Sequence, residues 1–182
     1  MNIKGFIFIL TALVLVSTKT PGQTLNFDFG SRNYGWHAVN NCEIEENDSY
    51  LQINIKGNDP QCMSPGNLKI DASAYKKIKI KLSNHTSPVL DIFWASRDDP
   101  RIRPEACQRS ILSSDSCDEN HTSLAQNQFI EYTIDLSNHK EWKGSIYKLR
   151  IDPGDGPDPK NMKDGKILKE EYLLIEYIKF VP

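Results

Sequence analysis

Residues 77–82 read KIKIKL, and this stretch decides the fold class. Isoleucine and leucine alternate strictly with lysine over its whole length. Because successive side chains of a β-strand point to opposite faces, this alternation predicts a strand with one apolar face and one solvated face. A helix would instead need apolar residues spaced three and four positions apart. The stretch therefore predicts a sheet that covers a core with one face and meets water with the other.

The same alternation recurs along the chain, and no window long enough for a helix shows helical periodicity. The predicted strands are residues 24–29, 50–55, 77–82, 89–95, 129–136, 146–151 and 173–181. Residues 89–95 are almost continuously apolar, which predicts an internal strand covered on both faces. Turn residues separate the strands, such as Gly-Asn-Asp-Pro at 57–60. Many strands at near-even spacing predict a single all-β domain, a jelly-roll or other β-sandwich.

The first 22 residues predict a cleaved secretory signal peptide. Lys4 precedes an apolar run at residues 6–16, which is too short for the ~20 residues of a membrane-spanning helix. Small residues then lead to a cleavage point before Gln23. We therefore expect a secreted, extracellular protein without a membrane span, whose one domain covers residues 23–182.

The charge of the mature chain argues against nucleic acid as a partner. Residues 1–22 contain two lysines and no acidic residue, so their removal leaves 20 basic and 24 acidic side chains. Nucleic-acid binding requires a basic surface, which this balance does not favour. The chain also lacks the Gly-x-Ser-x-Gly, His-Glu-x-x-His and phosphate-loop motifs of common enzymes. We expect no catalytic activity, although a glycosidase would need only two well-placed carboxylates.

An even number of cysteines in an exported chain predicts disulfide bonds. Cys42, Cys62, Cys107 and Cys117 allow three pairings. We favour Cys42–Cys62 and Cys107–Cys117, because each bond closes a loop between predicted strands. Each bond would stabilise the fold by about 3 kcal/mol. The alternative, a zinc site, lacks both a Cys-x-x-Cys pair and clustered histidines.

Three Asn-x-Ser/Thr triplets begin at Asn47, Asn84 and Asn120. Such triplets accept N-linked glycans in a eukaryotic secretory pathway. All three fall where loops are expected between the predicted strands.

Short motifs in the C-terminal third extend the prediction. They are a Trp-x-Gly turn at residues 142–144, an Arg-Ile-Asp-Pro strand end at 150–153 and a final Ile-Glu-Tyr-Ile strand at 175–178. With Phe-Asp-Phe at 27–29 and Gly-Trp at 35–36, this pattern resembles galactose-binding-like jelly-roll modules, the fold of many carbohydrate-binding modules and discoidin-type domains. The resemblance implies a jelly-roll sandwich over nearly the whole mature chain.

A structural calcium between the first and last strands occurs in many members of that fold. The resemblance places its candidate ligands at Asp28 and Glu176, and carboxylate oxygens suit Ca²⁺. Glu176 stands where the family usually has aspartate. No other cofactor is expected.

Sugar binding in water needs an apolar platform, which aromatic rings supply. Trp36, beside Gly35 in an expected loop, is the best candidate for an exposed platform. Trp94 shares a strand face with Leu90 and Ile92, so a core position and a platform are equally open for it. We expect Trp142, next to its glycine turn, to lie in the core.

Polar contacts to a sugar are expected from two places. Arg150 and Asp152 alternate with apolar residues on their strand and should point away from the core. Arg97 follows the strand of Trp94 in a loop with Arg101 and Arg103, where a guanidinium could hold a carboxylate or sulfate. The alternative for this loop is a solvated charged surface.

The predicted function is that of a secreted, non-catalytic, lectin-like protein that binds an extracellular glycan or polysaccharide. Two alternatives stay open. One is a structural component of an extracellular or biomineral matrix, which uses the sandwich as an interaction scaffold. The other, weaker one is a small polysaccharide-degrading enzyme.

Overall fold

The computed structural model describes residues 25–30, 32–112, 128–157, 161–164, 166–168 and 170–182. The strands are β1 Leu25–Asp28, β2 His37–Asn40, β3 Cys42–Glu46, β4 Leu51–Ile55, β5 Gln61–Met63, β6 Ile70–Asp71, β7 Lys77–His85, β8 Val89–Ser96, β9 Cys107–Ile111, β10 Ile130–Asp135, β11 Ser145–Pro153, β12 Met162–Lys163, β13 Lys166–Ile167 and β14 Tyr172–Val181. Within the described ranges, no helix has the length and apolar character needed to cross a membrane. The predicted signal peptide lies outside these ranges.

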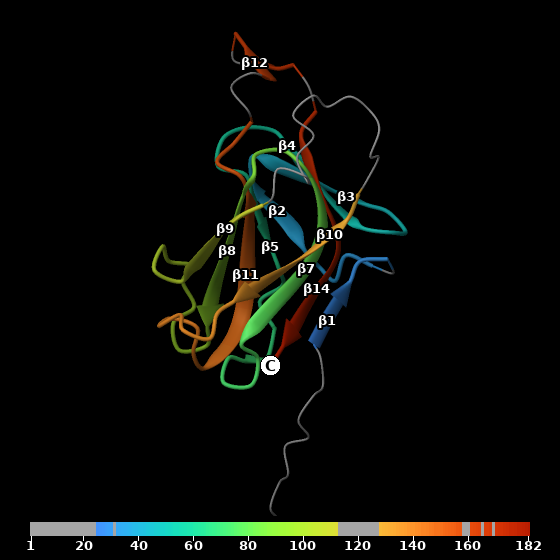
Figure 1. The fold of residues 1–182 in the computed structure, drawn as a ribbon. Helices are drawn as coiled ribbons and strands as arrows, with labels where there is room; N and C mark the ends of the chain where they lie inside the picture. Colours follow the sequence, from blue (N-terminus) through green and yellow to red (C-terminus); the bar gives the residue numbers. More distant parts are fainter. Residues whose placement is uncertain (1–24, 31, 113–127, 158–160, 165, 169) are drawn as a thin grey trace, which may run out of the picture.

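Two antiparallel sheets pack face to face as a sandwich (Figure 1). Sheet A has the order β10-β7-β14-β4-β3, with β1 paired to β14, and sheet B has the order β2-β5-β11-β8-β9, with β6 paired to β11. The last strand, β14, lies between β7 and β4, so strands that are distant in sequence become neighbours. This arrangement confirms the prediction of an all-β jelly-roll sandwich.

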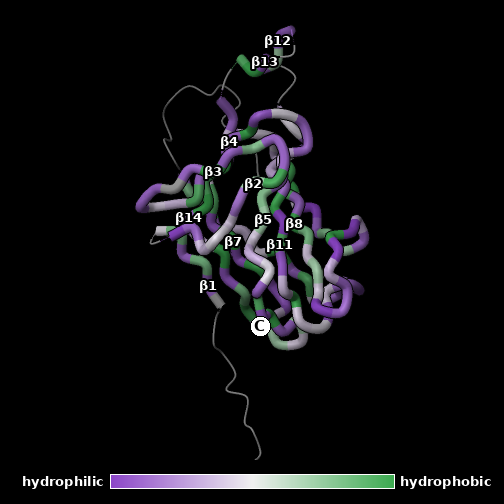
Figure 2. The backbone as a smooth tube through the Cα atoms, turned by 180° about the vertical axis from the view of Figure 1, so that it is seen from behind, coloured by the Kyte–Doolittle hydropathy of each residue, from purple (hydrophilic) through white to green (hydrophobic). Residues whose placement is uncertain are grey.

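The core between the sheets is built by the alternation seen in the sequence. On β7, Ile78, Ile80 and Leu82 are fully buried, whereas the intervening lysines lie on the outer face of sheet A. Figure 2 shows the apolar stretches along the strands and the polar ones in the loops. Complete burial of each such side chain stabilises the fold by about 1.5–3 kcal/mol.

The tryptophans all belong to this core. Trp142 lies parallel to Phe180 with ring centroids 6.4 Å apart, and Trp94 meets Trp142 edge to face at 5.1 Å. The expectation that Trp142 packs inside is confirmed, and of the two options for Trp94 the structure selects the core, where it is 1% exposed.

The prediction that Trp36 is an exposed platform is wrong. Its side chain is 2% exposed and meets the ring of Phe27 edge to face at 5.9 Å. The reason is local backbone geometry, since Tyr34 and Gly35 both adopt positive φ angles of 56° and 78°. This left-handed turn reverses the chain and directs the next side chain between the sheets.

The predicted Cys42–Cys62 disulfide is also wrong, because both residues are free, buried thiols. Cys42 belongs to sheet A and Cys62 to sheet B, and the Cys42 thiol donates a hydrogen bond to the carbonyl oxygen of Gln61 at 3.0 Å. Burial raises the pKa of both thiols, and disulfide formation requires the thiolate. Cys107 is a free thiol as well, and Cys117 lies outside the described residues.

The glycosylation triplets fall in three different settings. Asn47 lies in the turn between β3 and β4, half-buried, as the loop prediction required. Asn84 is not in a loop: it belongs to β7, is 1% exposed, and its amide donates to the carbonyl oxygen of Ser87 at 2.8 Å. β7 thus extends past residues 77–82 to His85, and the Asn84 side chain is satisfied by a nearby backbone carbonyl. Asn120 lies outside the described residues.

Candidate functional site

The outer face of sheet B brings side chains from four strands into one row. Arg150 of β11 lies between Met63 of β5 and Phe93 of β8, and Cys107 of β9 follows Phe93. The inner residues of β5, β8 and β11 are buried, so alternation turns their outer residues in this row away from the core. The predicted outward direction of Arg150 is therefore confirmed.

Arg150 is held by three different contacts. Its Nη2 donates to Asp152 Oδ2 at 2.8 Å, and its Nη1 donates to Gln61 Oε1 at 3.3 Å. The guanidinium carbon lies 4.1 Å from the centroid of the Phe93 ring, a cation–π contact. The guanidinium is thus fixed in place before any ligand arrives.

Asp152 is a carboxylate in an unusual position. It points outward like Arg150, yet its side chain is only 7% exposed. Burial raises the pKa of Asp152 to about 7, against the lowering effect of Arg150, and the charges of Asp59 and Asp91 add to the rise. Its Oδ1 and the Nε of Arg150 are buried without a hydrogen-bond partner among the described residues. Such groups destabilise a fold by about 1–3 kcal/mol each, so their retention calls for an explanation.

A second ion pair lies beside the first. Asp91 of β8 is the strand neighbour of both Asp152 and Arg109. Arg109 donates three hydrogen bonds to the Asp91 carboxylate, at 2.9, 3.2 and 2.7 Å, and one to Asp155 at 3.0 Å. These contacts raise the pKa of the Arg109 guanidinium. Each guanidinium of the face is therefore matched to at least one carboxylate.

The sequence predicted only part of this cluster. Asp91 and Phe93 alternate with Leu90, Ile92 and Trp94, but so apolar a strand was interpreted as covered on both faces. The signal that could have identified them is this alternation, since a polar and an aromatic residue share the outer positions of β8. Nothing local marks Gln61 or Arg109, because only strand pairing brings them to Arg150 and Asp91.

The arginine-rich loop lies apart from this cluster, at one end of the sandwich. It contributes to a groove of about 680 Å³ whose lining includes Trp94, Arg103 and Glu141. Arg103 forms ion pairs with Asp99 and Glu141, both at 3.1 Å, so its positive charge is already balanced. Arg97 is exposed and outside the groove lining. The structure therefore does not bring Trp94 and Arg97 together with Arg150.

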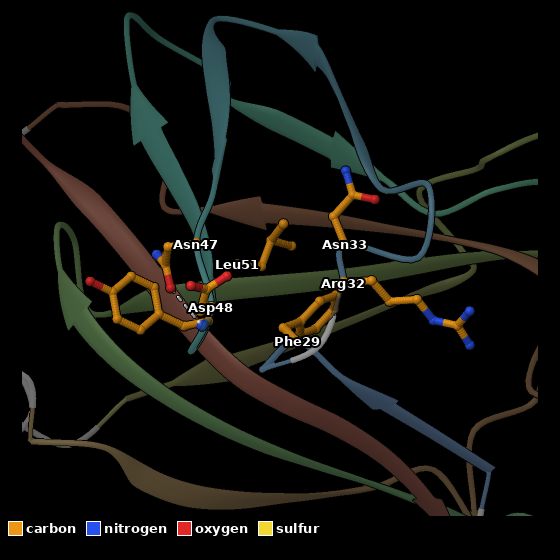
Figure 3. Close-up of a pocket in the computed structure, with 7 residues that line it drawn as sticks. Phe29, Arg32, Asn33, Asn47, Asp48 and Leu51 are labelled. Carbon is orange, nitrogen blue, oxygen red and sulfur yellow. Dashed lines mark hydrogen bonds between the residues drawn. The ribbon is translucent and has the colours of Figure 1, made fainter.

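A small cavity of about 120 Å³ opens where the segment after β1 faces the β3–β4 turn (Figure 3). Its lining residues are Phe29, Arg32, Asn33, Asn47, Asp48, Tyr50 and Leu51. Figure 3 shows that Arg32 points away from Asp48, and its guanidinium lies 4.4 Å from the centroid of the Tyr34 ring. The cavity therefore has no opposing pair of charges at its centre.

The two predicted calcium ligands both already have hydrogen-bond or ion-pair partners. Glu176 faces Lys81 at 2.8 Å on the outer face of sheet A, so an ammonium group already neutralises it. Asp28 Oδ1 accepts a hydrogen bond from the Gly30 N–H at 3.3 Å. Three or more Asp, Glu, His or Cys side chains do not cluster as metal ligands anywhere in the described ranges. Calcium binding at Asp28 and Glu176 stays a prediction.

These features define the fold as a galactose-binding-like jelly-roll β-sandwich, and solved structures of carbohydrate-binding modules share it. The BiXyn10A CBM1 module in its apo form superposes with a TM-score of 0.53 at 12% identity, over 87% of this chain and 96% of that chain. The xylan-binding module CBM86 of Roseburia intestinalis superposes with a TM-score of 0.52 at 15% identity, over 87% of this chain and 95% of that chain.

A third solved structure, a CBM28 module specific for non-crystalline cellulose, superposes with a TM-score of 0.50 at 11% identity, over 83% of this chain and 89% of that chain. No protein-family model matches the sequence, and no curated protein matches it. At these identities the likeness shows the shared fold.

Proposed function

We propose that this chain is a secreted, non-catalytic protein that binds a polysaccharide across the outer face of sheet B. The observation that carries the proposal is the fixed Arg150 guanidinium between the Phe93 ring, Gln61 and Asp152. The solved modules of the same fold support it, since their names record binding of xylan and of non-crystalline cellulose.

The chemistry of the face suits a sugar. A pyranose has an apolar C–H side that can rest on the Phe93 ring. Its hydroxyl groups can exchange hydrogen bonds with the planar Arg150 and Gln61 side chains, and bonds to a charged group contribute about 1.5–3 kcal/mol. Because Arg150 and Arg109 are each paired with aspartate, the cluster favours a neutral polysaccharide over a sulfated one.

Replacement of Phe93 by alanine tests this site. We expect retarded migration of the wild-type chain in native gels containing xylan or hydroxyethylcellulose. Phe93→Ala should weaken binding about tenfold, the equivalent of ~1.4 kcal/mol, because the apolar platform is lost. Tyr177→Ala is the matched control, since this ring belongs to the outer face of the opposite sheet. Equal migration of Phe93→Ala and wild type would contradict the proposed site.

Secretion and the absence of catalysis, the other two parts of the proposal, are each tested by a separate measurement. Sequencing of the exported product should begin at Gln23 if the signal peptide is cleaved as predicted. Incubation of the wild-type chain with the polysaccharide that it binds should release no new reducing ends. Release that disappears with a single carboxylate substitution would instead support the hydrolase alternative.

A further inference from the structure

The outer face of sheet A carries a group of rings that no sequence motif indicated. Tyr172 of β14 is the strand neighbour of His85 of β7, and their rings stack with centroids 4.4 Å apart. Tyr50 and Phe129 form a second pair at 5.9 Å. Tyr172 and His85 lie next to the buried residues Leu173 and Asn84 of their strands, so alternation directs them outward. Tyr50 and Phe129 immediately precede β4 and β10. All four rings are half-buried, which leaves part of each open to solvent.

The two ring pairs belong to one surface. Leu174, two residues after Tyr172, is the strand neighbour of Gln52 on β4 and of Ser83 on β7. Tyr50 lies two residues before Gln52, and Phe129 precedes Ile130, which pairs with Leu82 of β7. The second ring pair therefore lies along the same outer face, next to the row of Tyr172 and His85. Tyr50 also lines the small cavity of Figure 3. The rings therefore form an apolar platform with a recess at one side.

Side-chain amides border this platform. Asn54 lies beside Tyr172 on β4, and Gln52 lies two residues before it. The Gln52 amide donates to Asn54 Oδ1 at 2.8 Å, and the Asn54 amide donates to Glu45 Oε2 at 3.4 Å. Because each amide offers two N–H donors and an acceptor, these bonds leave hydrogen-bonding capacity on both side chains.

The local charge selects among ligands. Glu43 is paired with Lys56 at 3.1 Å, whereas Glu45 has no cation partner in the described part of the chain. The border of the platform is therefore negative, which disfavours sulfated or uronic acid chains. Carboxylate and amide oxygens accept hydrogen bonds from the hydroxyl groups of a neutral sugar.

We propose that this surface, formed by Tyr50, Phe129, Tyr172 and His85 with Gln52 and Asn54, is a second saccharide-binding site for a neutral glycan. It lies on the opposite outer face of the sandwich from Phe93 and Arg150 and does not depend on that site. Two sites on opposite faces cannot engage one short oligosaccharide together, so the chain would bridge separate polysaccharide strands.

Amide chemical shifts during titration with cellohexaose and with xylohexaose test the proposal. We expect two separate sets of shifted residues, one on β8 and β11 and one on β4 and β14. Gln52→Ala should weaken the second set about tenfold and leave the first unchanged, because it removes hydrogen bonds without disturbing the packed rings. Lys79→Gln, at the ion-paired end of the same face, is the control and should change neither set.

The outcomes separate this site from the one on sheet B. Shifts confined to β8 and β11 would overturn the second site and leave the first intact. Shifts confined to β4 and β14, unchanged by Phe93→Ala, would support the second site and overturn the first. Loss of both sets in Phe93→Ala, with its thermal unfolding unchanged, would show one site only and would overturn the second.

Discussion

The two outer faces of this sandwich handle charge in opposite ways. On sheet A, the side chains of the Lys79–Glu131 pair are 38% and 37% exposed, so water solvates both charges. On sheet B, those of the Arg150–Asp152 pair are 18% and 7% exposed. Exposed pairs contribute little to stability, whereas a buried pair needs its partner to offset desolvation. The lysines on the outer face of sheet A thus form a solvated surface, whereas the Arg150–Asp152 pair on sheet B is held in place and suited to ligand recognition.

The largest expected effect tests this contrast directly. Arg150→Ala should lower the free energy of unfolding by about 3 kcal/mol at pH 8, because it leaves the Asp152 carboxylate buried without a cation. Lys79→Ala should lower it by less than about 1 kcal/mol. Urea denaturation of both variants gives the comparison. Equal losses would remove the distinction between the two faces.

The next effect concerns pH. Burial raises the pKa of Asp152 to about 7 in the folded chain, from 3.8, so between these values the folded state binds more protons than the unfolded state. Stability from this group should therefore be greatest at low pH and fall as the pH rises toward 7, with a slope of at most about 1.4 kcal/mol per pH unit.

Urea denaturation at a series of pH values between 4 and 8 measures this slope. Asp152→Asn is the matched variant, since it keeps the shape of the side chain and removes the titration. We expect a flatter pH profile for the variant than for the wild type. Parallel profiles would show that Asp152 does not titrate in this range.

The smallest expected effect is on sheet A. Lys81→Ala should lower the free energy of unfolding by less than about 1 kcal/mol at low salt, because the side chains of Lys81 and Glu176 are each about one-third exposed to solvent. In 1 M NaCl, where screening acts over about 3 Å, the difference from the wild type should shrink. A loss that persists at high salt would indicate that this pair is more than a solvated surface contact.

Much of the fold followed from local pattern. Residues 77–82 and 173–181 predicted the two longest neighbours of sheet A, and both are strands with buried inner residues. The short strands escaped prediction, because a strand such as β5, with three residues, has no room for a recognisable alternation. Its position is set by pairing with β11 and β2, which lie far away in the sequence.

The candidate site also has a part that the sequence predicted and a part that it did not. Arg150 and Asp152 were predicted to point outward, because alternation along one strand is a local property. That Phe93 and Gln61 contact Arg150 could not be predicted, because these contacts depend on the register between distant strands. The predictions for Trp36 and Cys42–Cys62 were wrong for a related reason. A left-handed turn directed the Trp36 ring inward, and Cys42 and Cys62 lie as free thiols in different sheets.

The sequence by itself determined that alternating side chains form sheets with one apolar face, since a strand places neighbouring residues on opposite sides. Only the tertiary structure decided which faces meet, which aromatic rings close the core and which polar side chains become neighbours. The physical reason is that strand pairing joins residues far apart in the sequence, such as Leu25 with Phe180, and no local interaction specifies that register.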